Sequence, residues 1–280
     1  MSTAHPERVG RLFGTGDPAD AAPRRAFALG CVVLFVGCAA ATVSAGVSMS
    51  AMAALPMRGG WSLSMHWLAM CGRNVPAQMA AWLGMWSAMT VAMMLPATVP
   101  NLWRYHCAAV HAGASRPHAL AACVGAGYLL VWLGLGVVIA ISGTAMASVL
   151  LERPALARAM PFGMAAVLIL AGALQCTAWK ARQLTHCRQW PIGADAAPSC
   201  FCRAWRCSLS LGRRCSASCA GLTAILLVGG VMDLRVMALV TAAITAERLS
   251  FRGDRVARAI GMLALVAGLW RMIVAITAAG

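Results

Sequence analysis

The sequence contains little charge and few acidic side chains. Only 11% of its 280 residues are charged, and Asp and Glu together number 8. A soluble globular chain is about one quarter charged, so an ordinary soluble fold is excluded. The sequence also has no carboxylate pair, Ser/His/Asp set or glycine-rich phosphate loop, which removes the common soluble catalytic motifs.

Long apolar stretches take the place of the missing charge, because 61% of the residues are hydrophobic. A helix needs roughly 20 apolar residues to cross a bilayer, and only a helix or a closed barrel satisfies its backbone there. We therefore predict an all-α fold, a polytopic bundle of seven transmembrane helices, with six as the alternative. The predicted spans are 26–47, 78–99, 120–142, 160–179, 215–231, 233–247 and 256–277.

The number of helices depends on the segment around Asp233. One helix over 215–246 would be about 48 Å long at 1.5 Å per residue, too long for a ~30 Å hydrocarbon core. We interpret this segment as a hairpin of two short helices that turns near Gly229-Gly230 and Asp233. Merging the two arms into one helix gives the six-helix alternative.

The basic residues indicate orientation. The net charge of +15 might suggest a nucleic-acid partner, but the arginines lie between apolar runs, so the expected partner is the lipid bilayer and not nucleic acid. With a cytoplasmic N-terminus, the seven-helix arrangement places most of the 23 Lys and Arg residues inside. It also makes 1–25 a flexible cytoplasmic tail, 26–280 the transmembrane domain, and 180–214 a cytoplasmic loop rich in Cys and Arg.

The first span has two interpretations. Arg24-Arg25 before an apolar run is similar to a twin-arginine signal, with Ala51-Met52-Ala53 as a possible cleavage site. We favour a retained anchor, because the charge-free run is longer than the ~7–15 residues of a usual signal peptide.

Methionine is the first candidate for metal chemistry, with 18 residues in the chain. Met85, Met89 and Met93 recur every four residues and share one helix face, and Met94 adjoins them. Thioethers are soft ligands that suit Cu(I). The alternative is that methionine is only a flexible apolar filler.

Cysteine is the second candidate. Half of the 12 cysteines lie between 187 and 219, on the predicted cytoplasmic side, where disulfides are rare. Cys215 and Cys219 are four residues apart, so both sulfurs can meet one soft ion, and His186-Cys187 could complete the site. No Cys-x-x-Cys pair is present, which excludes a zinc ribbon. The alternative is packing by small apolar thiols.

Ionisable residues at membrane depth are functional candidates. Asp233, within the predicted hairpin, is a possible functional intramembrane acid, and its alternative is a solvated turn residue. We expect Glu247 and Arg248 to lie at the membrane interface.

Several of these segments together indicate a family. Residues 85–96 (MWSAMTVAMMLP) are followed by Lys180, then His186-Cys187-Arg188, then Cys215 and Cys219, then Gly229-Gly230, then Ala246-Glu247. In this order, over about 78–270, the chain resembles a bacterial family of predicted metal-binding integral membrane proteins of unknown function. The resemblance implies a bacterial inner-membrane location. The chain departs from the family pattern at Gln183, Leu211, Ser218 and Asp233, where cysteine, histidine, cysteine and asparagine are usual.

The sequence therefore predicts an integral membrane protein that binds a soft transition metal, with a copper ion preferred over other soft metals. Its function would be metal handling, either transport or delivery, with a metallochaperone or a cuproenzyme as partner and without catalysis. The alternatives are a subunit of a membrane-bound redox enzyme and a metal-free assembly or anchoring subunit. The predicted metal ligands are Met85, Met89, Met93, Met94, His186, Cys187, Cys215 and Cys219.

Overall fold

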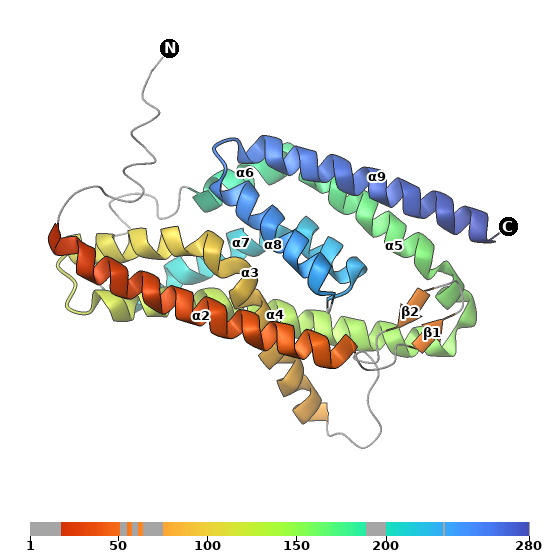
Figure 1. Cartoon of the computed structure of the whole chain (residues 1–280), viewed down its shortest axis with the longest axis horizontal. Helices are drawn as coiled ribbons and strands as arrows, with labels where there is room; N and C mark the ends of the chain where they lie inside the picture. Colours follow the sequence, from red (N-terminus) through yellow and green to blue (C-terminus); the bar gives the residue numbers. More distant parts are fainter. Residues whose placement is uncertain are drawn as a thin grey trace, which may run out of the picture.

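The computed structural model of the protein describes residues 18–50, 55–57, 61–63, 75–188, 200–231 and 233–279. These residues form a helical bundle with one small antiparallel hairpin, which confirms the helical part of the predicted fold class (Figure 1). The helices are α2 (Pro18–Ser50), α3 (Val75–His111), α4 (Pro117–Glu152), α5 (Pro154–Gln175), α6 (Ala178–Arg188), α7 (Phe201–Gly229), α8 (Leu234–Leu249) and α9 (Gly253–Ala279). The strands are β1 (Leu55–Met57) and β2 (Trp61–Leu63).

Six of the described helices are long and apolar enough to cross a membrane, namely α2, α3, α4, α5, α7 and α9. The predicted span 233–247 corresponds to α8, which has only 16 residues. Such a helix is about 24 Å long at 1.5 Å per residue, shorter than the ~30 Å core. The predicted break between the two arms is present, but the second arm is not one of the candidate spans.

Two predicted boundaries are wrong. Residues 180–214 were expected to be a loop, yet α6 reaches Arg188 and α7 begins at Phe201, while 189–199 lie outside the described residues. The first turns of α7 are amphipathic: Ala204 and Ser208 are buried, whereas Arg203 and Arg206 are exposed. A search for charge-free runs misses such a helix. At the N-terminus, α2 begins at Pro18 and takes in part of the predicted tail; 1–17 and the possible cleavage site at 51–53 lie outside the described residues.

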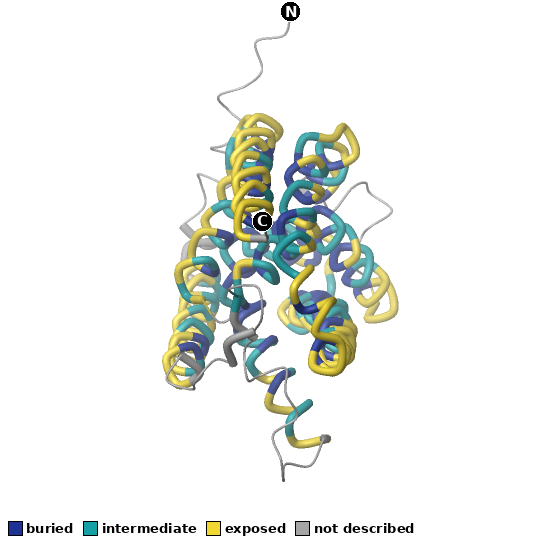
Figure 2. The backbone as a smooth tube through the Cα atoms, turned by 90° about the vertical axis from the view of Figure 1, so that its right-hand side faces the viewer, coloured by how far each residue is buried: buried dark blue, intermediate teal, exposed yellow. Residues whose placement is uncertain are grey.

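The bundle has a central group of helices and a lateral pair. Helix α3 packs on α4 and α8, α4 packs on α7, and α2 covers the outer side of α3. Helices α5 and α9 run side by side along the other side of the molecule, and α5 also contacts α7 (Figure 1). Figure 2 shows the exposed residues on the outer faces of the peripheral helices and the buried ones toward the middle. The core therefore lies among α3, α4, α7 and α8.

Tryptophan side chains fasten α3 to α4. Trp86 Nε1 donates a hydrogen bond to the backbone oxygen of Trp132 at 2.8 Å, and Trp82 Nε1 donates to that of Gly136 at 3.1 Å. Gly136 leaves room for the indole, because a Cβ at this position would lie 2.5 Å from Trp86. This contact positions the methionine-bearing segment of α3 against α4.

The turn between α7 and α8 is built from glycine and aspartate. Gly230 has a φ of 106°, which other residues rarely adopt. Asp233 then caps α8, and its Oδ1 accepts hydrogen bonds from the backbone amides of Arg235 (2.8 Å) and Val236 (3.3 Å). The two helices therefore double back on one another.

Candidate metal centre

Two thiols lie together in the core of the central helices. Cys215 and Cys219 are 0% and 2% exposed, and their spacing on α7 turns both sulfurs to the same face. From α4, the Tyr128 hydroxyl approaches Cys215 Sγ at 2.9 Å. The predicted cysteine pair therefore forms one compact sulfur site.

Arg248 brings a guanidinium group to this pair from α8. Its Nη2 donates to Cys215 Sγ at 2.7 Å, to Cys219 Sγ at 3.3 Å and to the Ser218 hydroxyl at 3.2 Å. Arg248 is only 7% exposed, so it is buried within the helix bundle, and its expected position at the membrane interface stays a prediction. The reason for the burial is the hairpin: Arg248 lies about as far after the turn at Gly230–Asp233 as the two cysteines lie before it. Antiparallel packing places the three side chains at the same level.

A second buried charge network adjoins the first. Lys180 Nζ, on α6, lies 2.7 Å from Glu247 Oε2 and also donates to the backbone oxygen of Ser218. Gln175 Nε2, at the end of α5, donates to Glu247 Oε1 at 2.8 Å. Lys180 and Glu247 are 1% and 2% exposed, so both charges lie inside the bundle, and the membrane-interface position expected for Glu247 stays a prediction. Opposite charges removed from water must be paired, and this pair satisfies that condition.

The two networks together leave one unbalanced positive charge beside the thiols. Lys180 and Glu247 neutralise each other, whereas Arg248 has sulfur and hydroxyl partners only among the contacts described. A buried cation of this kind is stabilised by a negative charge on its partner. The site can therefore accommodate a ligand set that carries a single negative charge.

Cys187 and His186, adjacent in sequence, are separated by the fold. Cys187 is buried, and its thiol donates to the Ser218 hydroxyl at 3.7 Å, next to the pair. Burial raises the pKa of the Cys187 thiol, while the nearby Arg248 guanidinium acts in the opposite direction. His186 is exposed and lines a separate cavity of about 530 Å³ together with Arg213 and Arg214. The structure brings Cys187 to the thiol pair and directs His186 elsewhere.

The methionines face the same core as the thiols. Met89, Met93 and Met94 are 3–4% exposed and belong to the buried cluster that also contains Cys187, Cys215 and Cys219. Met85 is half-buried against this cluster. The thioethers of α3 thus point inward and not toward the periphery of the molecule.

Asp233 has a local function at the exposed turn. Its carboxylate accepts from two backbone amides at the start of α8, as an N-cap does. This geometry corresponds to a turn residue, and an intramembrane role for Asp233 stays a prediction.

Tyr128 and Arg248 are the site residues that sequence reasoning missed. The sequence did offer a signal for Arg248. This arginine follows the predicted turn at about the distance by which the two cysteines precede it, so an antiparallel hairpin would bring it level with them. Tyr128, one of two tyrosines in the chain, gave no signal of this kind. Among the described residues, no group of three or more His, Cys, Asp or Glu side chains is arranged to hold a metal ion. The donors of this centre are therefore two thiols supported by a third.

Comparison with known families adds an independent finding. The family model PpoB2, described as a copper chaperone, matches residues 83–271, which is more than half of the chain. The matched range contains the methionine face, the thiol pair and Arg248. Neither the curated proteins nor the solved structures contain a match to the chain.

Proposed function

The chain belongs to the PpoB2 copper chaperone family, and from this premise we propose that it is an integral membrane protein that carries Cu(I) on Cys215 and Cys219 and delivers it to a cuproenzyme. Copper is the cargo here. The observation that carries the proposal is the Arg248 guanidinium, which donates to both sulfur atoms inside the core. Thiolates are soft ligands that select Cu(I), and in this arrangement their charge has a fixed counterion.

The charge of the site favours a monovalent ion. A cuprous ion held by two thiolates has one net negative charge, and Arg248 supplies one positive charge, so the complex is neutral as a whole. A divalent ion on the same two thiolates would itself be neutral and would leave the guanidinium uncompensated in the core. The buried arginine therefore supports Cu(I) in preference to Zn²⁺.

The methionine face supports a route for the ion to this centre. Met89, Met93 and Met94 present uncharged, soft donors in the same core as the thiols, and Met85 adjoins them. Thioethers bind Cu(I) without needing a counter-charge, which suits a low-dielectric interior. We assign the methionines a relay role and the cysteines the resting site.

Insertion in a membrane is supported by the outer surface. Large apolar side chains are widely exposed on the peripheral helices, for example Leu29 (66%) on α2 and Leu263 (71%) on α9. A soluble protein would not leave such extended surfaces in water. With six candidate spans, this surface supports lipid contact. The family resemblance supports a bacterial inner membrane, and the arginine distribution of the seven-helix arrangement supports a cytoplasmic N-terminus.

The direct test is a Cu(I) competition titration of the purified chain against bicinchoninate, with and without Cys215→Ser/Cys219→Ser. We expect the variant to lose one high-affinity Cu(I) per chain. The matched control is Cys31→Ser/Cys38→Ser, which removes two half-buried thiols from α2 and should bind as the wild type does. Equal binding by the wild type and the Cys215/Cys219 variant would overturn the assignment.

The relay is tested separately with Met89→Leu/Met93→Leu, which keeps the side chains apolar and similar in volume. We expect unchanged final occupancy of the thiol pair and slower loading. Loading at the wild-type rate would remove the methionines from the path and leave the cysteine site intact.

A further inference from the structure

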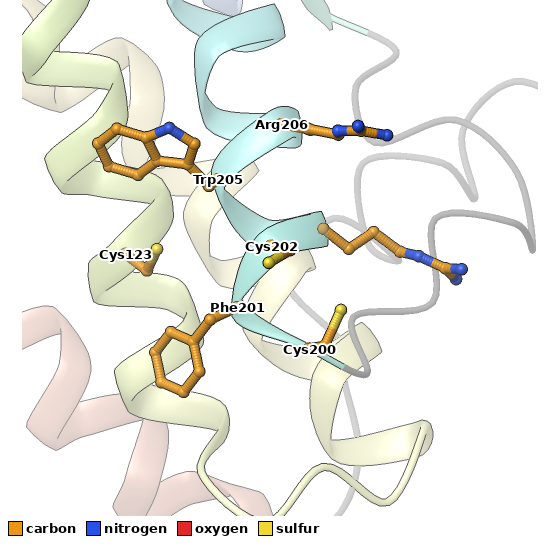
Figure 3. A pocket seen from close by; sticks show the side chains of 7 residues that line it. Cys123, Cys200, Phe201, Cys202, Trp205 and Arg206 are labelled. Atoms are coloured by element: carbon orange, nitrogen blue, oxygen red, sulfur yellow. The ribbon is translucent and has the colours of Figure 1, made fainter.

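We propose that the cavity lined by Cys123, Cys200 and Cys202 is a second cuprous site, where two of its thiols receive Cu(I) from a thiol carrier before the ion passes to Cys215 and Cys219. This inference rests on the proposed function and adds the chemical class of the donor. The three thiols line one cavity of about 660 Å³ at the start of α7 (Figure 3). Nothing in the family match assigns a site there.

The three sulfurs come from two helices that pack on each other. Cys123 lies on α4, and Cys200 and Cys202 lie at the beginning of α7. In Figure 3 the Cys202 side chain is directed toward α4, where Cys123 lies, while the Arg206 side chain extends away from α4. A cuprous ion needs as few as two sulfur ligands, so the cavity does not have to supply a closed shell. An open site of this kind suits an ion that must be released again.

Packing does not account for the positions of Cys200 and Cys202. Free cysteine is among the most buried residue types, yet Cys200 and Cys202 are both exposed and unoxidised. Cys200 occupies the N-cap position of α7, but its side chain makes no capping hydrogen bond. Neither thiol fills the core or stabilises the helix end. Ligand binding remains as a reason for placing both in one cavity with Cys123.

The cavity and the buried centre lie along the same helix–helix seam. Helix α7 carries Cys202 near its start and Cys215 thirteen residues later, about 20 Å along the axis at 1.5 Å per residue. The half-buried Cys207 lies between them and packs against the core. On α4, Cys123 precedes Tyr128, which contacts Cys215. The seam therefore joins an exposed sulfur site to the buried one.

The transfer step is ligand exchange without a change of oxidation state. Two carrier thiolates leave Cu(I), and two thiols of the cavity replace them as ligands. Each cavity thiol gives its proton to a departing carrier thiolate, so protons, charge and copper are conserved. Arg203 and Arg206, which are exposed at the start of α7, place positive charge beside the cavity, and this charge attracts an anionic cuprous–thiolate carrier complex.

The experiment uses the full chain in detergent and Cu(I) supplied as its glutathione complex. Bound copper and loading rate are measured for the wild type, for Cys123→Ser/Cys200→Ser/Cys202→Ser, and for Cys215→Ser/Cys219→Ser. We expect two Cu(I) per wild-type chain and one in each variant, with slower loading of the buried pair in the triple variant. The matched control, Cys31→Ser/Cys38→Ser/Cys176→Ser, removes the same number of thiols elsewhere and should behave as the wild type does.

The outcomes separate this inference from the proposed function. A triple variant that binds as much copper as the wild type, at the same rate, would overturn the second site while leaving Cys215 and Cys219 as the carrier. If the triple variant binds less copper than the wild type but Cys215→Ser/Cys219→Ser does not, the buried carrier site is overturned and the cavity site is kept. Retention of one Cu(I) by the triple variant also shows that this variant is folded.

Discussion

The helix pairs α5–α9 and α7–α8 are both closely packed, but opposite kinds of residue fill their interfaces. Between α5 and α9 the contact is made by glycines: a Cβ on Gly172 would lie 2.7 Å from the backbone oxygen of Gly261. Between α7 and α8, Arg248 reaches the thiols of Cys215 and Cys219. Small residues let apolar helices approach closely at little cost, whereas a buried charge is costly and is usually kept for a function. The first interface brings two helix backbones into close contact, and the second gathers a buried charge and two thiols.

The largest expected effect comes from breaking the glycine contact with Gly172→Leu. The new side chain would meet the Gly261 oxygen and the Leu265 nitrogen, which are backbone atoms and cannot move aside. We expect the free energy of unfolding to fall by more than about 3 kcal/mol, which is the upper end of ordinary overpacking costs. Reversible unfolding of the variant and the wild type in mixed detergent micelles measures this difference in stability.

The control for this change is Gly163→Leu on the same helix, because nothing lies within 4 Å of a Cβ there. If Gly172→Leu and Gly163→Leu have the same free energy of unfolding, close backbone contact does not stabilise the α5–α9 interface.

The next largest effect is expected from Glu247→Gln, which removes the partner of the buried Lys180. Breaking a buried ion pair on one side leaves an uncompensated charge and costs about 3 kcal/mol or somewhat more. Unfolding in the same micelles is the measurement. The control is Asp254→Asn, since the Asp254–Arg258 pair is more than half exposed and should contribute little. Equal stability of the two variants would contradict the role of Lys180–Glu247.

We expect Arg248→Met, which removes the guanidinium, to lower the affinity for Cu(I) more than it lowers the stability of the fold. Groups that orient or charge-balance metal ligands typically contribute 10–100-fold in affinity, about 1.4–2.7 kcal/mol. Competition titration with bicinchoninate measures this directly. Arg235→Met, an exposed arginine on the same helix, is the matched control and should leave the affinity unchanged. An unaffected Arg248→Met protein would rule out charge balance as the basis of Cu(I) selection.

The smallest effect is expected from Tyr128→Phe, which deletes only the hydroxyl that lies 2.9 Å from Cys215 Sγ. The net contribution of one such hydrogen bond is about 1 kcal/mol. The same titration should show a modest weakening of Cu(I) binding with the fold intact. A change as large as that of Arg248→Met would make Tyr128 a ligand-positioning group equal to the arginine.

The sulfur site shows which parts of a centre can be predicted locally. The spacing of Cys215 and Cys219, and of Met85, Met89 and Met93, follows from helix geometry alone, and these residues do share faces that turn into the core, Met85 only in part. Glu247 and Arg248 were placed at the interface because charges next to an apolar run usually lie there. Their burial depends on Lys180, Ser218 and the thiols, which belong to segments distant in sequence.

The boundaries of α7 and α8 make the same point for the fold. The break at Gly230 was predicted from glycine and the nearby aspartate, and it is present. The early start of α7 at Phe201 was not predicted, because its exposed arginines share the helix with buried small residues such as Ala204. Tertiary packing against α4 decides which face of that segment is buried.

By itself, the amino-acid sequence determined that this chain is helical and where most helices lie, because long apolar segments must satisfy their backbone hydrogen bonds locally. It also determined which sulfurs share a helix face. Only the tertiary structure decided that Arg248, Lys180 and Glu247 are buried, because a charged group leaves water only where partners from other helices meet it. Those partners are set by how the helices cross and by the register of the α7–α8 hairpin.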